Sequence, residues 1–234
     1  MAKPKAIVLC SGGLNSAVMA AVAQQENTLA MLHVRFGHRA ADRESQFFDR
    51  QVDQLDPAQH LAIDMPHFAT IGGNARVSKK YALEDARAIS DGKSNGYVPG
   101  MVGSLLSAAF SWASVIGAQR ILIGLSEDLG PPGPRTSTIY PDYSREVVEL
   151  CNQAFAMASV AKPISIEAPM IDLQRSDIIK LGRRANAPFE YTWSCLSNGE
   201  EPCGACIGCA TRARGFVDAG IPDPLLVKEA IGVR

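Results

Sequence analysis

The sequence predicts an α/β protein in which helices cover both faces of a parallel β-sheet. Short apolar segments alternate with longer helix-compatible segments, as in consecutive β-α-β units. The 234 residues, of which 47% are hydrophobic and 20% charged, suffice for the core of one such domain with a small appended module. No apolar segment approaches the roughly 20 residues that span a bilayer, and no signal peptide is recognisable, so we expect a cytoplasmic protein.

Five apolar segments are the predicted strands, and five segments after them are the predicted helices. The strands are residues 6–10, 28–34, 60–63, 120–124 and 164–168. The helices are residues 16–24, 40–55, 103–116, 144–158 and 174–184, each with enough Ala, Leu, Glu, Arg or Gln. Residues 72–97 and 127–142 interrupt this alternation with polar or proline-rich sequence. We expect both to be loops over the carboxyl edge of the sheet that contact a ligand; insertions without a role are the alternative.

A glycine-rich segment links the first predicted strand to the first predicted helix. Residues 11–16 read Ser-Gly-Gly-Leu-Asn-Ser. The two glycines permit a tight turn with bare backbone N–H groups, and the helix start adds unpaired amides and the positive end of its dipole. We therefore expect a phosphate site, although for the loop alone a simple connecting turn is the alternative. The spacing matches neither Gly-x-x-x-x-Gly-Lys-Ser/Thr nor Gly-x-Gly-x-x-Gly.

Four of the six cysteines lie close together near the carboxyl end. They are Cys195, Cys203, Cys206 and Cys209, in the pattern Cys-x7-Cys-x2-Cys-x2-Cys. Such spacing predicts a tetrahedral zinc site, and four thiolates leave no position for a catalytic water, so the metal is expected to be structural. A disulfide framework is the rival interpretation, which fits a cytosolic chain poorly. Cys10 and Cys151 are expected to pack as small core residues.

Several segments together resemble a known family. The glycine-rich loop resembles the pyrophosphate loop of N-type ATP pyrophosphatases, usually Ser-Gly-Gly-x-Asp-Ser, and residues 192–216 closely resemble the carboxyl end of one such family, the 7-cyano-7-deazaguanine synthases. Residues 98–100, 140–142 and 168–170 resemble that family's Val-Pro-Gly-Arg-Asn, Tyr-Pro-Asp-Cys-Arg and Ala-Pro-Leu segments. The resemblance implies a Rossmann-like fold of the adenine nucleotide alpha hydrolase type. It also implies an ATP pyrophosphatase domain over residues 1–190 and a zinc-binding segment over residues 191–234.

The resemblance implies an ATP-dependent carbon–nitrogen ligase. Its substrates would be 7-carboxy-7-deazaguanine and ammonia, and its product the nitrile 7-cyano-7-deazaguanine of a queuosine-type pathway. The carboxylate attacks the α-phosphate of ATP, pyrophosphate leaves into the loop with Mg²⁺, and ammonia displaces AMP to give an amide. A second adenylation, on the amide oxygen, allows dehydration. The family usually forms homodimers, which we also expect here.

The resemblance also assigns candidate site residues. Those expected to bind ATP are Cys10, Ser11, Gly12, Gly13, Leu14, Asn15, Ser16 and Gly124. Those expected in the catalytic centre are Ser11, Asn15, Ser16 and Arg39, and those expected to contact substrate are Tyr97, Pro99, Asp142 and Arg145. Arg39 could meet phosphate or carboxylate as a bidentate donor, or lie on the surface. Asp142 could accept two N–H bonds from an amino-pyrimidinone edge, or shape a turn. His38 and His67 could be acid–base groups, or packing residues.

Departures from the family pattern leave alternatives open. Asn15 stands where the family has Asp, which weakens any Mg²⁺ interaction because hard cations prefer carboxylates. Met101 and Val102 replace the Arg-Asn pair, and Ala40 replaces a His. The alternatives are a different substrate or a non-catalytic nucleotide- or deazapurine-binding module. A zinc-ribbon nucleic-acid binder is a third hypothesis, against which the net charge of −1 counts.

Overall fold

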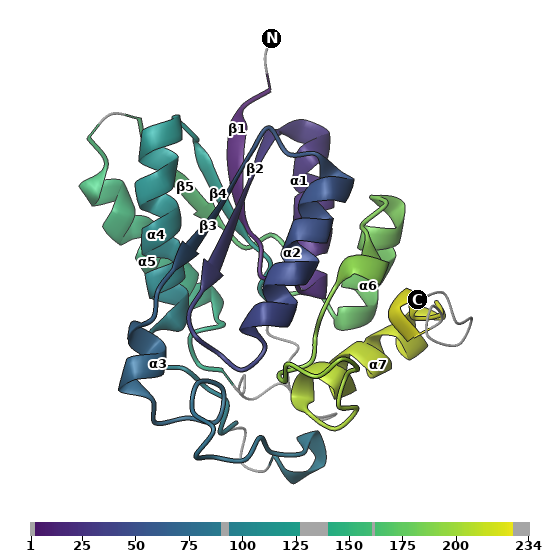
Figure 1. The fold of residues 1–234 in the computed structure, drawn as a ribbon. Helices are drawn as coiled ribbons and strands as arrows, with labels where there is room; N and C mark the ends of the chain where they lie inside the picture. The colour runs from purple at the N-terminus through teal and green to yellow at the C-terminus, as the bar shows by residue number, and fades with distance from the viewer. Residues whose placement is uncertain (1–2, 90–93, 127–139, 161, 227–234) are drawn as a thin grey trace.

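The computed structural model describes residues 3–89, 94–126, 140–160 and 162–226. A five-stranded parallel sheet forms its centre (Figure 1), in the order β3-β2-β1-β4-β5. The strands are β1 (Lys5–Leu9), β2 (Thr28–Arg35), β3 (Gln59–Asp64), β4 (Arg120–Ile123) and β5 (Ser165–Glu167). Each predicted strand is present, with ends within one residue of those expected. The parallel α/β fold predicted from the sequence is confirmed.

Helices cover both faces of this sheet. On one face lie α1 (Leu14–Glu26), α2 (Ala41–Leu55) and α6 (Arg175–Arg184), and on the other lie α4 (Met101–Ile116) and α5 (Arg145–Ala158). These five helices are the five predicted, with ends shifted by at most two residues. The short α3 (His67–Ile71), η1 (Ala86–Ala88) and η2 (Phe189–Tyr191), and the longer α7 (Ile207–Ala219), were not predicted.

The core has two layers because side chains alternate along the strands. In β1, Ala6 and Val8 pack with α1 and α6, whereas Ile7 and Leu9 pack with α4, and all four are buried. Burial of each large aliphatic side chain contributes about 1.5 to 3 kcal/mol. This two-sided burial explains why β1 reads as a continuous apolar run.

The strand order places a ligand crevice at one edge of the sheet. From central β1 the chain proceeds outward to β2 and β3, whereas β4 lies on the other side of β1 and leads to β5. The loops that follow β1 and β4 therefore diverge at the carboxyl ends of these neighbours. Open α/β sheets bind ligands at such a switch point.

The carboxyl-terminal segment packs against this edge through its own small core. Trp193 and three of the clustered cysteines share that core with Ala40 and with Phe47 of α2. Helix α7 packs on α6, where the Cβ of a residue replacing Gly215 would lie 2.2 Å from Arg175 Cγ. The division at residue 190 remains a prediction. Among the described residues, no helix has the length and apolar character needed to traverse a lipid bilayer.

Candidate active site

A pocket opens at the switch point of the sheet. It is a cavity of about 220 Å³ that opens to solvent at its mouth. The ends of β1 and β4, the glycine-rich loop, the start of α6 and the carboxyl-terminal segment line it. Of the residues expected to bind ATP, those in its wall are Cys10, Ser11, Gly13, Leu14, Asn15, Ser16 and Gly124.

The glycine-rich loop is an ordered turn with amides at the helix start. Gly13 is the N-cap of α1, and no side chain among the described residues caps this helix. Ser16 Oγ accepts the Ser11 N–H at 3.2 Å and donates to the Gly13 carbonyl at 3.0 Å, so it holds the turn from inside. The remaining amides and the helix dipole suit an anion.

Gly12 is fixed between two neighbours. Its φ of +77° is accessible mainly to glycine, and an added Cβ would lie 2.2 Å from the Glu44 carbonyl oxygen. Its own carbonyl accepts hydrogen bonds from Gln51 Nε2 at 3.0 Å and from the Trp193 N–H at 2.9 Å. The loop is therefore joined to α2 and to the carboxyl-terminal segment.

A buried histidine supports the loop from beneath. His33 Nδ1 lies 2.8 Å from the Cys10 carbonyl, and its Nε2 lies 3.1 Å from Ser45 Oγ. Burial lowers the pKa of His33, so the ring is neutral, donates from Nδ1 and accepts the Ser45 hydroxyl proton. Burial also raises the pKa of the Cys10 thiol, which makes it an inert core group, as expected for this residue.

Asn15 contacts Arg175, a cation that was not among the predicted site residues. Arg175, 9% exposed, donates from Nη1 to the Asn15 side-chain oxygen, and both residues line the pocket. Arg175 is the first residue of α6, where the helix dipole disfavours a positive charge. A cation at this unfavourable position of a predicted helix was the only feature of the sequence that pointed to a role for Arg175 outside helix stability. The positive charge beside the loop therefore comes from a segment 160 residues away.

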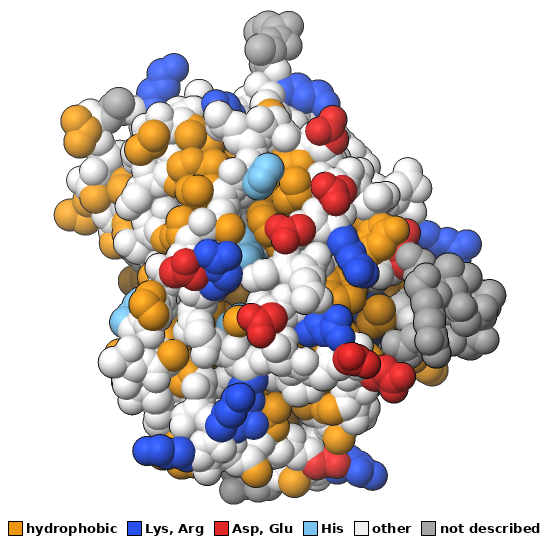
Figure 2. All heavy atoms as spheres, in the orientation of Figure 1, with side chains coloured by type: hydrophobic (Ala, Val, Ile, Leu, Met, Phe, Trp, Pro, Cys, Tyr) orange, Lys and Arg blue, Asp and Glu red, His pale blue; other side chains and the backbone are white. Residues whose placement is uncertain are grey.

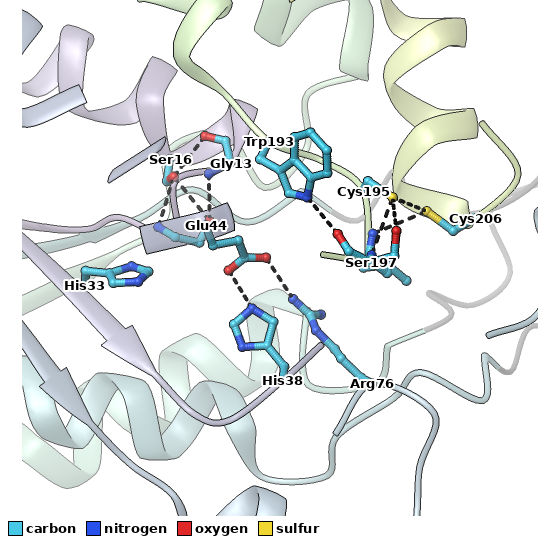
Figure 3. A network of polar contacts seen from close by, with 12 residues as sticks. Gly13, Ser16, His33, His38, Glu44, Arg76, Trp193, Cys195, Ser197 and Cys206 are labelled. Atoms are coloured by element: carbon cyan, nitrogen blue, oxygen red, sulfur yellow. Dashed lines mark hydrogen bonds and ion pairs between the residues drawn. The ribbon is translucent and has the colours of Figure 1, made fainter. Parts of the chain in front are cut away.

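Two residues of a second polar cluster, Glu44 and Arg76, line the same pocket. Figure 3 shows His38 and Arg76 converging on the carboxylate of Glu44. The Glu44 side chain is 9% exposed; its Oε2 lies 2.9 Å from His38 Nε2, and its Oε1 lies 3.9 Å from Arg76 Nη2. Burial would raise the pKa of Glu44, but His38 and Arg76 outweigh burial and hold it below its usual value. Of these three residues, only His38 was a candidate from the sequence, and no carboxylate partner was predicted for it.

The structure gives Arg39 a different position from the one expected. Its Nη2 donates to the carbonyl of Ser78 at 2.7 Å and also to that of Tyr81, and it is absent from the pocket wall. Its backbone N–H donates to the Arg76 carbonyl at 2.9 Å. Arg39 therefore supports the loop over residues 72–97, and Arg76 from that loop enters the pocket instead.

The four expected substrate residues lie outside the pocket wall. Arg145 is exposed and pairs with the carboxylate of Asp172, Tyr97 stacks on Tyr140 with centroids 6.3 Å apart, and Pro99 is exposed. Asp142 is buried, and its Oδ2 accepts the Val102 N–H at 3.2 Å near the start of α4. Asp142 therefore binds the backbone near the start of α4 and is not part of the pocket wall, and its ligand role stays a prediction. The rest of the loop, residues 127–139, lies outside the described residues.

The four clustered cysteines meet the geometric requirements of a zinc site. The sulfur atoms of Cys195, Cys203, Cys206 and Cys209 all lie within 4.8 Å of one another. Three of the pairs are 3.6, 4.0 and 4.0 Å apart, whereas tetrahedral Zn–S bonds of 2.3 Å place sulfurs about 3.8 Å apart. The set could hold a metal such as zinc, with all four positions filled by thiolates.

Residues next to the clustered cysteines in the chain form part of the pocket wall. Seven residues from the segment that carries the cysteines line the pocket: Trp193, Ser194, Leu196, Ile207, Gly208, Thr211 and Arg212. At Gly208, an added Cβ would lie 1.9 Å from the Ser194 carbonyl oxygen, so the two turns of the cluster touch. The segment that carries the four cysteines therefore also forms part of the pocket wall.

Comparison with known proteins agrees with this architecture. A family model described as "Queuosine biosynthesis protein QueC" matches residues 5–220. A protein of Koribacter versatilis (strain Ellin345) named 7-cyano-7-deazaguanine synthase is 38% identical over 226 residues, covering 94% of this chain and 92% of that protein. One of the same name from Methanothrix thermoacetophila is 34% identical over 227 residues, covering 94% and 97%.

Among solved structures, the NMN synthetase of Francisella tularensis aligns with 99% of this chain and 79% of its own, at 11% identity and a TM-score of 0.47. This similarity is too distant to contribute to the assignment. The family match and the full-length relatives are sufficient without it. The chain belongs to the QueC family of queuosine biosynthesis proteins, whose curated relatives are named 7-cyano-7-deazaguanine synthases.

Proposed function

We propose that this protein is an ATP-dependent ligase that converts 7-carboxy-7-deazaguanine and ammonia into 7-cyano-7-deazaguanine, with release of AMP and pyrophosphate. The observation that carries the proposal is the pocket at the switch point. Its wall includes the glycine-rich loop with Arg175 and, in contact with that loop, the segment that carries the cysteines. The relatives named 7-cyano-7-deazaguanine synthase align with this chain over 92% and 97% of their own length.

The wall residues suit carboxylate activation by positioning and charge. The amides at the start of α1 would hold the β- and γ-phosphates, with Ser11 and Ser16 beside them. Arg175 would supply positive charge as pyrophosphate departs. The substrate carboxylate would attack the α-phosphate from the Glu44 side of the pocket, and ammonia would then displace AMP.

The deciding experiment is product formation by the purified protein. Incubation with ATP, Mg²⁺, ammonia and 7-carboxy-7-deazaguanine should release AMP and yield the nitrile, both measured by liquid chromatography and mass spectrometry. Parallel reactions with other planar heterocyclic acids test the substrate. If no AMP is released with any of these acids although ATP binds, the protein is a non-catalytic binding module. The relatives, which are named synthases, do not favour that alternative.

Asn15→Asp tests how the loop handles Mg²⁺. An added carboxylate beside the phosphates should lower the Mg²⁺ concentration for half-maximal AMP release by roughly fivefold, equivalent to about 1 kcal/mol between unit charges in water-like surroundings. Asn95→Asp, at an exposed site outside the pocket wall, is the matched control. An unchanged Mg²⁺ requirement in Asn15→Asp would mean that this side chain does not meet the metal.

A homodimer is proposed through the outer face of α5. Leu150, Ala154 and Met157 recur at helical spacing on this face, and Leu150 and Met157 are 64% and 90% exposed. Figure 2 shows hydrophobic side chains on the side of the molecule where α4 and α5 lie. A second copy of this chain would cover them.

Met157→Glu should weaken this dimer without unfolding the monomer, because the side chain is exposed within one copy. Sedimentation velocity should show a dissociation constant raised about tenfold or more, the effect of about 1.4 kcal/mol. Val217→Glu replaces another exposed apolar residue, on α7, and should leave association unchanged. A parent protein that stays monomeric at high concentration would contradict the proposal.

A further inference from the structure

The cluster of Glu44, His38 and Arg76 has hydrogen-bonding capacity that the described residues do not use. Arg76 Nη2 and Glu44 Oε1 face each other at 3.9 Å, which is beyond hydrogen-bonding distance. Arg76 Nε is buried and has no hydrogen-bond partner among the described residues. Buried polar groups are normally satisfied, so unused donors and acceptors in a pocket wall indicate a ligand.

The cluster is rigidly held. His38 stacks on Phe36 with ring centroids 4.0 Å apart, and its Nε2 lies 2.9 Å from Glu44 Oε2. The Arg76 guanidinium lies 5.4 Å from the centre of the same Phe36 ring. Burial would lower the pKa of Arg76, but Tyr143 and Glu44 outweigh burial and raise it, so the guanidinium stays charged. A carboxylate and a guanidinium thus stand side by side in fixed positions.

This arrangement is complementary to one edge of a particular heterocycle. A 2-aminopyrimidin-4-one presents two N–H donors beside a carbonyl acceptor. Glu44 offers carboxylate acceptors, and Arg76 next to it offers N–H donors. Phe36, Tyr140 and Tyr143 line the same part of the pocket and give a planar ring apolar contacts. Met101, where the resembled family has Arg, adds a further apolar group.

We infer that Glu44 and Arg76 read the 2-aminopyrimidin-4-one edge of the substrate, with Glu44 accepting the ring and exocyclic N–H groups and Arg76 donating to the carbonyl oxygen. His38 is a positioning residue that fixes the carboxylate. The inference rests on the proposed function for the identity of the acid, but it concerns recognition and not turnover. It gives to Glu44 the role that the sequence assigned to Asp142.

The test compares two ligands on two proteins by calorimetry without ATP. The ligands are 7-carboxy-7-deazaguanine and its analogue without the 2-amino group. The parent protein should bind the first about 10- to 100-fold more tightly, because the analogue leaves a buried carboxylate acceptor unpaired. Glu44→Gln should lose most of that preference by weakening the first ligand more than the analogue, which keeps the ring N–H. A separate titration should show that its affinity for ATP stays at the parent value. Glu26→Gln, at an exposed position on α1, is the matched control.

Each alternative outcome is distinct. Equal binding of both ligands by the parent protein overturns the inference, and this result needs no variant to fold. An equal loss for both ligands in Glu44→Gln overturns the inference in favour of a structural role for Glu44. A loss of ATP affinity in this variant overturns it in favour of a contact between Glu44 and the adenine of ATP. Discrimination in binding without AMP release would retain the inference and reject the ligase, whereas equal AMP release on both acids would do the reverse.

Discussion

Cys206→Ser should abolish metal binding and ligase activity together. Cys206 is 2% exposed, and its sulfur lies 3.6 Å from that of Cys209 and 4.0 Å from that of Cys195. Structural zinc sites in small peptides contribute about 10 to 16 kcal/mol, so losing one ligand should cost about 4 kcal/mol or more of stability. Because this segment forms one wall of the pocket, AMP release should fall at least 100-fold, as about 2.7 kcal/mol of lost positioning requires.

Trp193 provides a local probe of this loss. Its indole Nε1 donates to the Ser197 carbonyl at 3.1 Å, and its ring packs on Phe47 with centroids 5.5 Å apart. Chelation of the metal should therefore shift Trp193 fluorescence, measured in a Trp112→Phe background, in parallel with zinc release. Cys151→Ser removes a thiol outside the cluster and should change neither zinc content nor fluorescence. Full activity in a zinc-free protein would show that the segment keeps its shape without metal.

The sequence predicted those parts of the site whose signals are local. The strand β1, the glycine turn and the start of α1 are continuous in the chain, and the cysteine spacing carries its own geometry. Helix α7 was missed because Gly208 and Gly215 lower its intrinsic propensity. Those glycines are required by close contacts with Ser194 and Arg175, which only the folded chain creates.

The partners of the predicted residues could not be found in the same way. Arg76 and Glu44 are 32 residues apart in the sequence, and Arg175 and Asn15 are 160 apart. Their proximity therefore depends on the sheet order and on how the loops fold over the sheet. Arg39 and Asp142 show the opposite case. Both have the chemistry of a ligand-binding group, but one supports the loop that carries Arg76 and the other caps the backbone near the start of α4. Residue type alone did not distinguish a supporting role from a contact with ligand.

Gly12→Ala should eliminate ATP binding, because the loop cannot move to accommodate a methyl group without losing other contacts. A methyl group would lie 2.2 Å from the Glu44 carbonyl oxygen, and Ala strongly disfavours a φ of +77°. Moving the loop away from Glu44 would break the bonds that Gln51 and Trp193 donate to the Gly12 carbonyl. Strain and lost hydrogen bonds of about 3 kcal/mol or more correspond to at least a 100-fold loss of ATP affinity in calorimetry.

Gly103→Ala separates this effect from the general consequence of replacing a glycine. Gly103 lies in α4, where an added Cβ meets no atom within 4 Å, so alanine should raise stability by about 0.5 to 1 kcal/mol and leave ATP affinity unchanged. Gly12→Ala with parental affinity for ATP would mean that the loop is free to shift. The anion site would then not depend on the turn that Glu44, Gln51 and Trp193 hold in place. Loss of ATP binding in a Gly12→Ala protein that keeps its zinc would instead locate the defect in the loop, because the cysteine segment would still be folded.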